Sequence, residues 1–185
     1  MKTILSATLC IAILAVSAYA ADTAAPSVGK IYDRQLTSLE HELVPLAEAM
    51  PAGKYDFAPT QGEFKGVRTF ALQARHIAYI LYEVSATLGG QKNPSQTGAN
   101  ENGPDDLKTK DQIVPYLKAA FAFSHQAMNT LTNANELDMV ESPFGDGKIP
   151  RVSLASIAIW HSYDHYGQMV VYARMNNVVP PASRR

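Results

Sequence analysis

Four stretches of about twenty residues each carry apolar side chains at the spacing of an α-helix, and they alternate with segments rich in glycine, proline and asparagine. The expected helices span residues 28–50, 69–88, 110–131 and 153–176. No strand-like alternation and no internal repeat competes with this pattern. Such a chain buries its apolar stripes by packing the helices on one another. We therefore predict an all-α fold, a four-helix bundle with antiparallel or crossover connections.

Several residues mark where these helices should break, stop or start. Pro45 predicts a kink or a break in the first helix, because proline donates no backbone hydrogen bond. Gly89-Gly90 is a stop signal for the second helix, and Ser153 is expected to cap the fourth. Residues 91–105 contain almost no apolar side chain. We expect a loop there that is long enough to move or to cover a site.

The first twenty residues have the features of a secretory signal peptide. Lys2 precedes an apolar run over residues 4–16, and Ala18-Tyr19-Ala20 forms a small-residue cleavage site. We predict cleavage after Ala20, a single domain over residues 21–185, and a periplasmic or secreted location. The run is short for a membrane span and polar sequence follows it, so no stable membrane anchor is expected after cleavage. An uncleaved N-terminal anchor is the alternative.

Composition excludes several functional classes. The only cysteine, Cys10, lies in the predicted signal peptide, so the mature chain has neither a disulfide nor a thiolate for catalysis or metal binding. The chain has a net charge of −1 and no basic stripe or basic patch interleaved with aromatic residues. We therefore expect no nucleic-acid partner.

His161 and His165 stand four residues apart in the fourth predicted helix, which places both imidazoles on one face. They fall within about 60° of the apolar line of that helix, which also holds Leu154, Ala158 and Tyr172. A buried imidazole needs a partner, because an unsatisfied polar group costs about 1–3 kcal/mol. One shared metal ion would satisfy both. The alternative is that each is a core histidine bonded to a neighbouring carbonyl or hydroxyl group.

A third metal ligand would have to come from another helix. The candidates are His41, His76 and His125, each in a different predicted helix. Helical periodicity does not choose among them, because His76 lies about 120° from the centre of its apolar stripe. His125 and His41 are each more typical of a structural or surface histidine than of a ligand.

Three motifs follow one another along the chain: Phe70-Ala-Leu-Gln-Ala-Arg-His-Ile-Ala78, His161-x3-His165-x-Gly-Gln168, and Tyr172-Ala-Arg174 followed by Pro180-Pro181. With these motifs the chain resembles the DinB-like (DinB/YfiT) superfamily from about Ile31 to Pro181. The resemblance implies a four-helix bundle and a metal triad of His76, His161 and His165. Family members often have two adjacent histidines where this chain reads Asp164-His165, so the outer one is missing here.

The resemblance and the residues together suggest a metal-dependent function. Three imidazoles suit a divalent ion such as Zn, Ni or Fe, and they leave at least one position for water or substrate. Relatives include thiol-cofactor transferases and a maleylpyruvate isomerase, which implies a hydrolase or thiol transferase acting on an unknown small molecule. The alternative is a non-catalytic metal-binding or helical interaction module. Family members often pair, so a homodimer is also expected.

Two polar residues are candidates to orient the metal ligands through their second ring nitrogens. Gln168 lies one turn beyond His165, and Asp164 lies about 60° from His161 around the helix. The alternatives are an interhelical hydrogen bond for Gln168 and a solvated helix face for Asp164.

Overall fold

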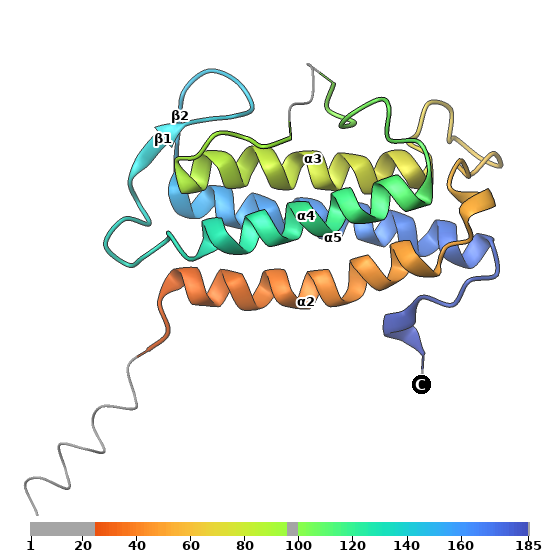
Figure 1. The fold of residues 1–185 in the computed structure, drawn as a ribbon, viewed down its shortest axis with the longest axis horizontal. Helices are drawn as coiled ribbons and strands as arrows, with labels where there is room; N and C mark the ends of the chain where they lie inside the picture. The colour runs from red at the N-terminus through yellow and green to blue at the C-terminus, as the bar shows by residue number, and fades with distance from the viewer. Residues whose placement is uncertain (1–24, 96–99, 185) are drawn as a thin grey trace, which may run out of the picture.

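The computed structural model describes residues 25–95 and 100–184, and most of these residues lie in long helices. The helices are α2 (Val28–Ala49), α3 (Phe70–Gly89), α4 (Lys110–Met128) and α5 (Arg151–Met175). They pack side by side as a bundle (Figure 1). The predicted all-α, four-helix fold is confirmed. The predicted signal peptide, with Cys10, lies outside the described residues.

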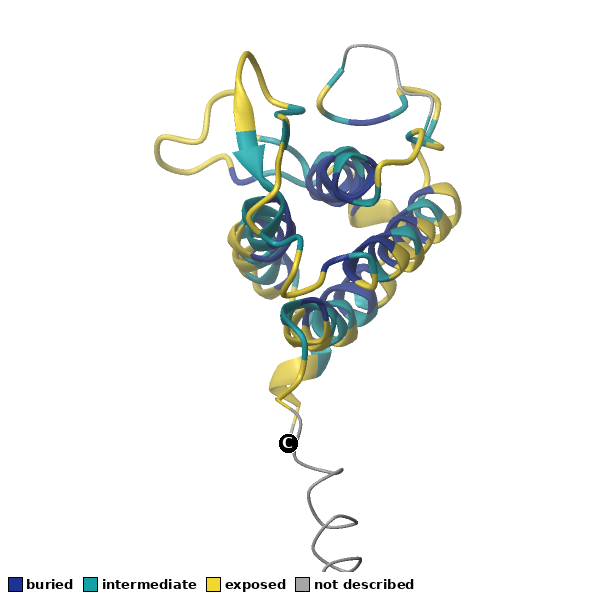
Figure 2. Cartoon of the chain, turned by 90° about the vertical axis from the view of Figure 1, so that its left-hand side faces the viewer, coloured by how far each residue is buried: buried dark blue, intermediate teal, exposed yellow. Residues whose placement is uncertain are grey.

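The connection between α3 and α4 determines the topology. Helix α3 packs against α4 and α5, and α2 packs against the same two helices, so that α2 and α3 lie diagonally opposite each other (Figure 2). Helices α3 and α4 run in the same direction, and the connection between them, described at residues 90–95 and 100–109, returns along the bundle (Figure 1). The bundle therefore contains one crossover connection, and this connection lies next to α3.

Helix α3 is the most deeply buried element. Its apolar side chains pack against α4 and α5, and even its polar residues Gln73, Arg75 and His76 are at most 5% exposed. Large, fully buried side chains come from all four helices and include Leu36, Leu39, Leu43, Leu46, Phe70, Ile77, Leu81, Leu88, Ile113, Leu117, Phe121, Leu154 and Met169. Since α3 is surrounded by protein, a polar residue on it must find a partner inside the molecule.

The helix ends agree only in part with the sequence signals. The hydroxyl of Thr69 accepts a hydrogen bond from the Leu72 amide, and Gly90 ends α3 in the left-handed conformation at φ 62°. Pro45 lies inside α2 without ending it. The prediction for Ser153 was wrong: α5 already begins at Arg151, because the fixed φ of Pro150 suits the residue before a helix.

A short hairpin precedes α5, although no strand was expected. Strands β1 (Met139–Glu141) and β2 (Lys148–Pro150) pair antiparallel, with Val140 opposite Ile149. Each strand has three residues, which is too short to produce a recognisable alternation of apolar and polar side chains. The turn between them holds Phe144 and uses Gly145 and Gly147 at positive φ.

Two short 3-10 helices lie outside the bundle helices, η1 (Ala52–Lys54) after α2 and η2 (Pro181–Ser183) near the C-terminus. Within residues 25–95 and 100–184, no helix combines the length and the apolar composition needed to cross a bilayer.

Candidate metal centre

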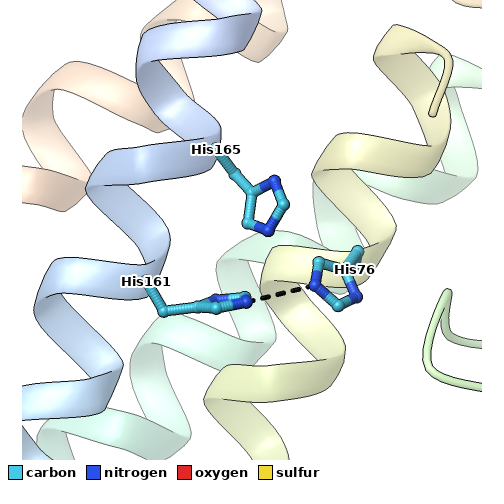
Figure 3. A group of neighbouring side chains, drawn as sticks. All are labelled: His76, His161 and His165. Atoms are coloured by element: carbon cyan, nitrogen blue, oxygen red, sulfur yellow. Dashed lines mark hydrogen bonds between the residues drawn. The ribbon is translucent and has the colours of Figure 1, made fainter. Parts of the chain in front are cut away.

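Three imidazoles from two helices meet in the bundle (Figure 3). His76 comes from α3, and His161 and His165 lie one turn apart on α5. One ring nitrogen of each histidine lies within 4.8 Å of those of the other two. His76 and His165 are buried and His161 is half-buried. The three histidines are therefore positioned so that they could bind one metal ion.

Hydrogen bonds at the outer nitrogens orient two of the rings. Nδ1 of His165 donates to the side-chain oxygen of Gln73 at 2.5 Å, and Nδ1 of His76 donates to the main-chain oxygen of Glu101 at 2.6 Å. A carbonyl oxygen only accepts, so Nδ1 carries the proton in both rings. Nε2 of each ring then keeps its lone pair, which is the arrangement of a histidine ready to bind a metal.

The spacing between nitrogens fits a shared cation. Nε2 of His76 lies 3.2 Å from Nε2 of His161. Two imidazole nitrogens bound to one tetrahedral zinc ion are separated by about 3.3 Å. Nδ1 of His161 is buried and has no hydrogen-bond partner among the described residues. Three imidazole nitrogens within 4.8 Å of one another suit zinc, nickel or iron and do not distinguish among them.

Burial keeps the three imidazoles neutral. Loss of solvation lowers the pKa of His76 below its ordinary value, the pKa of His161 to about 4 and the pKa of His165 to about 3. The neighbouring imidazoles add to the shift for His161 and His165, because two positive rings repel each other. All three are therefore neutral near pH 7, which is the form that binds metal.

A chain of amides connects His165 to the surface. Nε2 of Gln73 donates to the side-chain oxygen of Gln168 at 2.8 Å, and Nε2 of Gln168 donates to the Asp164 carboxylate at 3.2 Å. Within the described part of the chain, neither Gln168 nor Asp164 forms a hydrogen bond directly with an imidazole. The direct contact to His165 is made by Gln73, which the sequence did not single out. Its place one turn before His76 on the same helix was the signal that could have identified it.

Arg68 stands at the edge of the site, just before α3. Its guanidinium donates to the Glu101 carboxylate at 2.7 Å and to the Asn102 side-chain oxygen at 2.6 Å. The hydroxyl of Tyr172 donates to the Arg68 main-chain oxygen at 3.2 Å, which supports the arginine from α5. The crossover connection thus supplies both the acceptor for His76 and the partner for Arg68, as expected of a loop that covers a site.

A cavity of about 430 Å³ opens beside the three histidines. Its polar lining comes from the histidines with Arg68 and Glu101, and its apolar lining from Ile80, Phe144, Ile157 and Trp160. A second cavity of about 470 Å³ shares Arg68, Glu101 and His165 with the first and has no aromatic residue in its lining. The three histidines are therefore accessible to a small molecule.

The other two histidines lie away from this site. His125 on α4 contacts two carboxylates of α2, with Nδ1 at 2.7 Å from Asp33 and Nε2 at 3.2 Å from Glu40. His41 is exposed on α2. Both residues have the structural or surface setting that their sequence context indicated.

A helical bundle in which three histidines converge belongs to the class of bundles that can build metal sites between facing helices. A family model for the DinB superfamily matches residues 35–169. Because this match covers most of the chain, the protein belongs to the DinB superfamily, and the resemblance noted in the sequence is confirmed.

A solved structure gives the same result for the fold. The chain is similar to a DinB-like protein of Bacillus subtilis, YjoA, with a TM-score of 0.60 and 17% sequence identity, over 79% of this chain and 91% of that chain. At this identity the likeness concerns the fold alone. A comparison with curated proteins finds no match.

Proposed function

We propose that the protein is a divalent-metal-dependent enzyme that acts on a small molecule, as a hydrolase or a thiol transferase. One observation supports this proposal above all others: three histidines whose ring nitrogens converge lie in the wall of an open cavity of about 430 Å³. A purely structural metal site has four protein ligands and is closed, whereas a catalytic site keeps a position for substrate. Among the described residues, no fourth His, Cys, Asp or Glu joins this cluster.

The polar residues around the cavity each have a role in this proposal. His76, His161 and His165 would hold zinc, nickel or iron. A bound ion of this kind polarises a carbonyl group or lowers the pKa of a water or thiol ligand. Arg68 is placed to bind an anionic group of the substrate, and the carboxylate of Glu101 is placed to accept a proton.

The choice between hydrolysis and thiol transfer needs an activity measurement. The zinc-, nickel- and iron-loaded proteins should be assayed with p-nitrophenyl acetate for hydrolysis, and with dithiothreitol plus monobromobimane for thiol transfer. We expect one of the two activities to exceed that of His161→Ala at least a hundredfold and to be lost on chelation. His41→Ala is the matched control, because His41 is exposed and away from the site.

The alternative role is non-catalytic metal binding or helical interaction, and it predicts a closed site. Cobalt-loaded protein distinguishes the two, because azide or a thiol changes the visible spectrum only if it reaches the ion. A spectrum unchanged by both ligands, together with no activity, would contradict the enzyme proposal.

We also propose that the chain is exported after cleavage at Ala20, that it acts in the periplasm or outside the cell, and that it forms a homodimer. The signal-like residues 1–20 support the first part, and the family resemblance supports a homodimer. The mass of the protein recovered from the exported fraction tests the cleavage site, and sedimentation tests the oligomeric state.

A further inference from the structure

Two aromatic side chains stand partly exposed in the wall of the cavity that holds the histidines. Trp160 is 57% exposed and Phe144 is 48% exposed, and both line the first cavity. Single exposed apolar residues are common on protein surfaces and need no explanation. Here the two come from separate elements, α5 and the β1–β2 turn, and line the same cavity as the metal-binding atoms.

Trp160 lies next to one of the three histidines, both in sequence and in space. It directly precedes His161 on α5, and the two rings lie edge to face with centroids 5.8 Å apart. Ile80 on α3 and Ile157 on α5 extend the apolar wall. A molecule bound through the histidine site would therefore have an apolar surface within reach of any group it carries on that side.

The second cavity, whose apolar lining comes from Val67 and Leu72, shows that Trp160 and Phe144 are specific to one side of the site. It shares His165 with the first cavity, but its other lining includes the polar side chains of Gln73, Asn102 and Gln168. The aromatic residues line only the first of these two cavities. A ring on a ligand would therefore have the side chains of Trp160 and Phe144 to pack against in the first cavity and not in the second.

We propose that the substrate class of this site is a small molecule that joins a metal-binding head to an aromatic group, and that Trp160 and Phe144 bind the aromatic group. This inference rests on the proposed metal-dependent function. Aromatic rings pack edge to face or offset on one another and bury large apolar areas. Trp160 and Phe144 are accordingly specificity-determining residues, distinct from the histidines that bind the metal-ligating head.

Two hydroxamates test the proposal, because they share a metal-binding head and differ in their apolar group. Affinities of benzohydroxamate and acetohydroxamate for the zinc-loaded mature protein should be measured by calorimetry. We expect benzohydroxamate to bind at least tenfold more tightly. The ratio should fall to below threefold in the Trp160→Ala/Phe144→Ala variant and should persist in Trp160→Phe, which keeps a ring.

Trp160 also supplies a direct readout, because it is the only tryptophan in the chain. Benzohydroxamate should shift its fluorescence to shorter wavelength as the indole loses water, and acetohydroxamate should shift it less. Val171→Ala is the matched control: Val171 is also on α5 and 52% exposed, but it does not line the cavity. This variant should keep the parental ratio of affinities.

The outcomes separate this inference from the function on which it rests. If both hydroxamates bind with equal affinity, the aromatic specificity is wrong and the open metal site stands. If the protein takes up no metal, or takes it up and binds neither hydroxamate, the proposed function fails and the inference fails with it. Retention of the tenfold ratio in the Trp160→Ala/Phe144→Ala variant would also overturn the inference.

Discussion

Gln73 on α3 accepts a hydrogen bond from Nδ1 of His165 on α5 at 2.5 Å, and the contact is buried between the two helices. The direction of this hydrogen bond follows from the Asp164 carboxylate, which lies at the other end of the chain of amides. The Asp164 carboxylate only accepts, so Gln168 turns its nitrogen toward Asp164 and its oxygen toward the nitrogen of Gln73. The oxygen of Gln73 must then face His165. Packing between α3 and α5 thereby sets which nitrogen of His165 is available to a metal.

Removing this acceptor should weaken metal binding. We expect Gln73→Leu to reduce the affinity for zinc about 10- to 100-fold, because an imidazole without its outer partner is less well oriented and less basic. Competition with a chromophoric chelator measures the change. Gln35→Leu is the control, since Gln35 is exposed on α2 and lines neither cavity. Equal affinities for Gln73→Leu and the parent would contradict the role assigned to Gln73.

The buried imidazoles should make the metal-free protein less stable in acid. Burial lowers the pKa of His161 to about 4 and of His165 to about 3, from an ordinary value of 6.5. Between pH 6.5 and these lowered values, the unfolded chain takes up protons that the folded chain does not. The stability that the two neutral imidazoles contribute is therefore complete above pH 6.5 and is lost as the pH falls toward 3. Melting temperatures of the chelated protein from pH 7 to pH 4 should therefore decline more steeply than those of His161→Gln/His165→Gln. Parallel profiles would show that these two residues do not titrate as described.

Gly29 should resist substitution although alanine favours helices. Helix α2 passes so close to the end of α4 that a Cβ at Gly29 would lie 2.5 Å from the main-chain oxygen of Met128 and closer still to that of Leu131. We expect Gly29→Ala to destabilise the protein by about 1–3 kcal/mol in chemical denaturation, as overpacked sites do. Gly167→Ala is the control, because nothing lies within 4 Å of its added Cβ. It should be neutral or stabilising by up to about 1 kcal/mol, and a stable Gly29→Ala would refute the close approach.

His125 should matter for stability and not for metal content. Its ring nitrogens contact Asp33 and Glu40, which ties α4 to α2. We expect His125→Ala to cost about 1–2 kcal/mol, because it leaves two half-buried carboxylates without this partner. Elemental analysis of the same variant should still give the metal content of the parent. Loss of metal in His125→Ala with an intact fold would mean that the ligand set has been misassigned.

The sequence predicted the helices well because the helical spacing of apolar residues extends over about five turns in each. The sequence predicted burial less accurately at positions where tertiary packing determines which side chains are covered. Met175 falls on the apolar line of α5 but is 50% exposed, and Ile31 at the start of α2 is 43% exposed. Both lie near helix ends, where the neighbouring helices no longer cover the stripe. The hairpin before α5 was missed because its strands are too short to show a pattern.

The residues of the candidate metal site could likewise be predicted only in part from the sequence. Four-residue spacing was enough to pair His161 with His165, but periodicity could not choose His76, which lies off the apolar stripe of α3 and yet is 4% exposed. The reason is that α3 is covered on several sides, so a residue away from its main stripe is still buried. The crossover connection adds the main-chain oxygen of Glu101, a contact between distant segments that helical periodicity cannot predict.

Elemental analysis of the mature protein, purified without added metal or a histidine tag, tests the central claim most directly. We predict one equivalent of a divalent metal in the parent and in His41→Ala, and its loss in His76→Ala, His161→Ala and His165→Ala. Absence of metal from the parent, no uptake on titration with zinc, nickel or iron, and unchanged melting of the three variants would contradict the account.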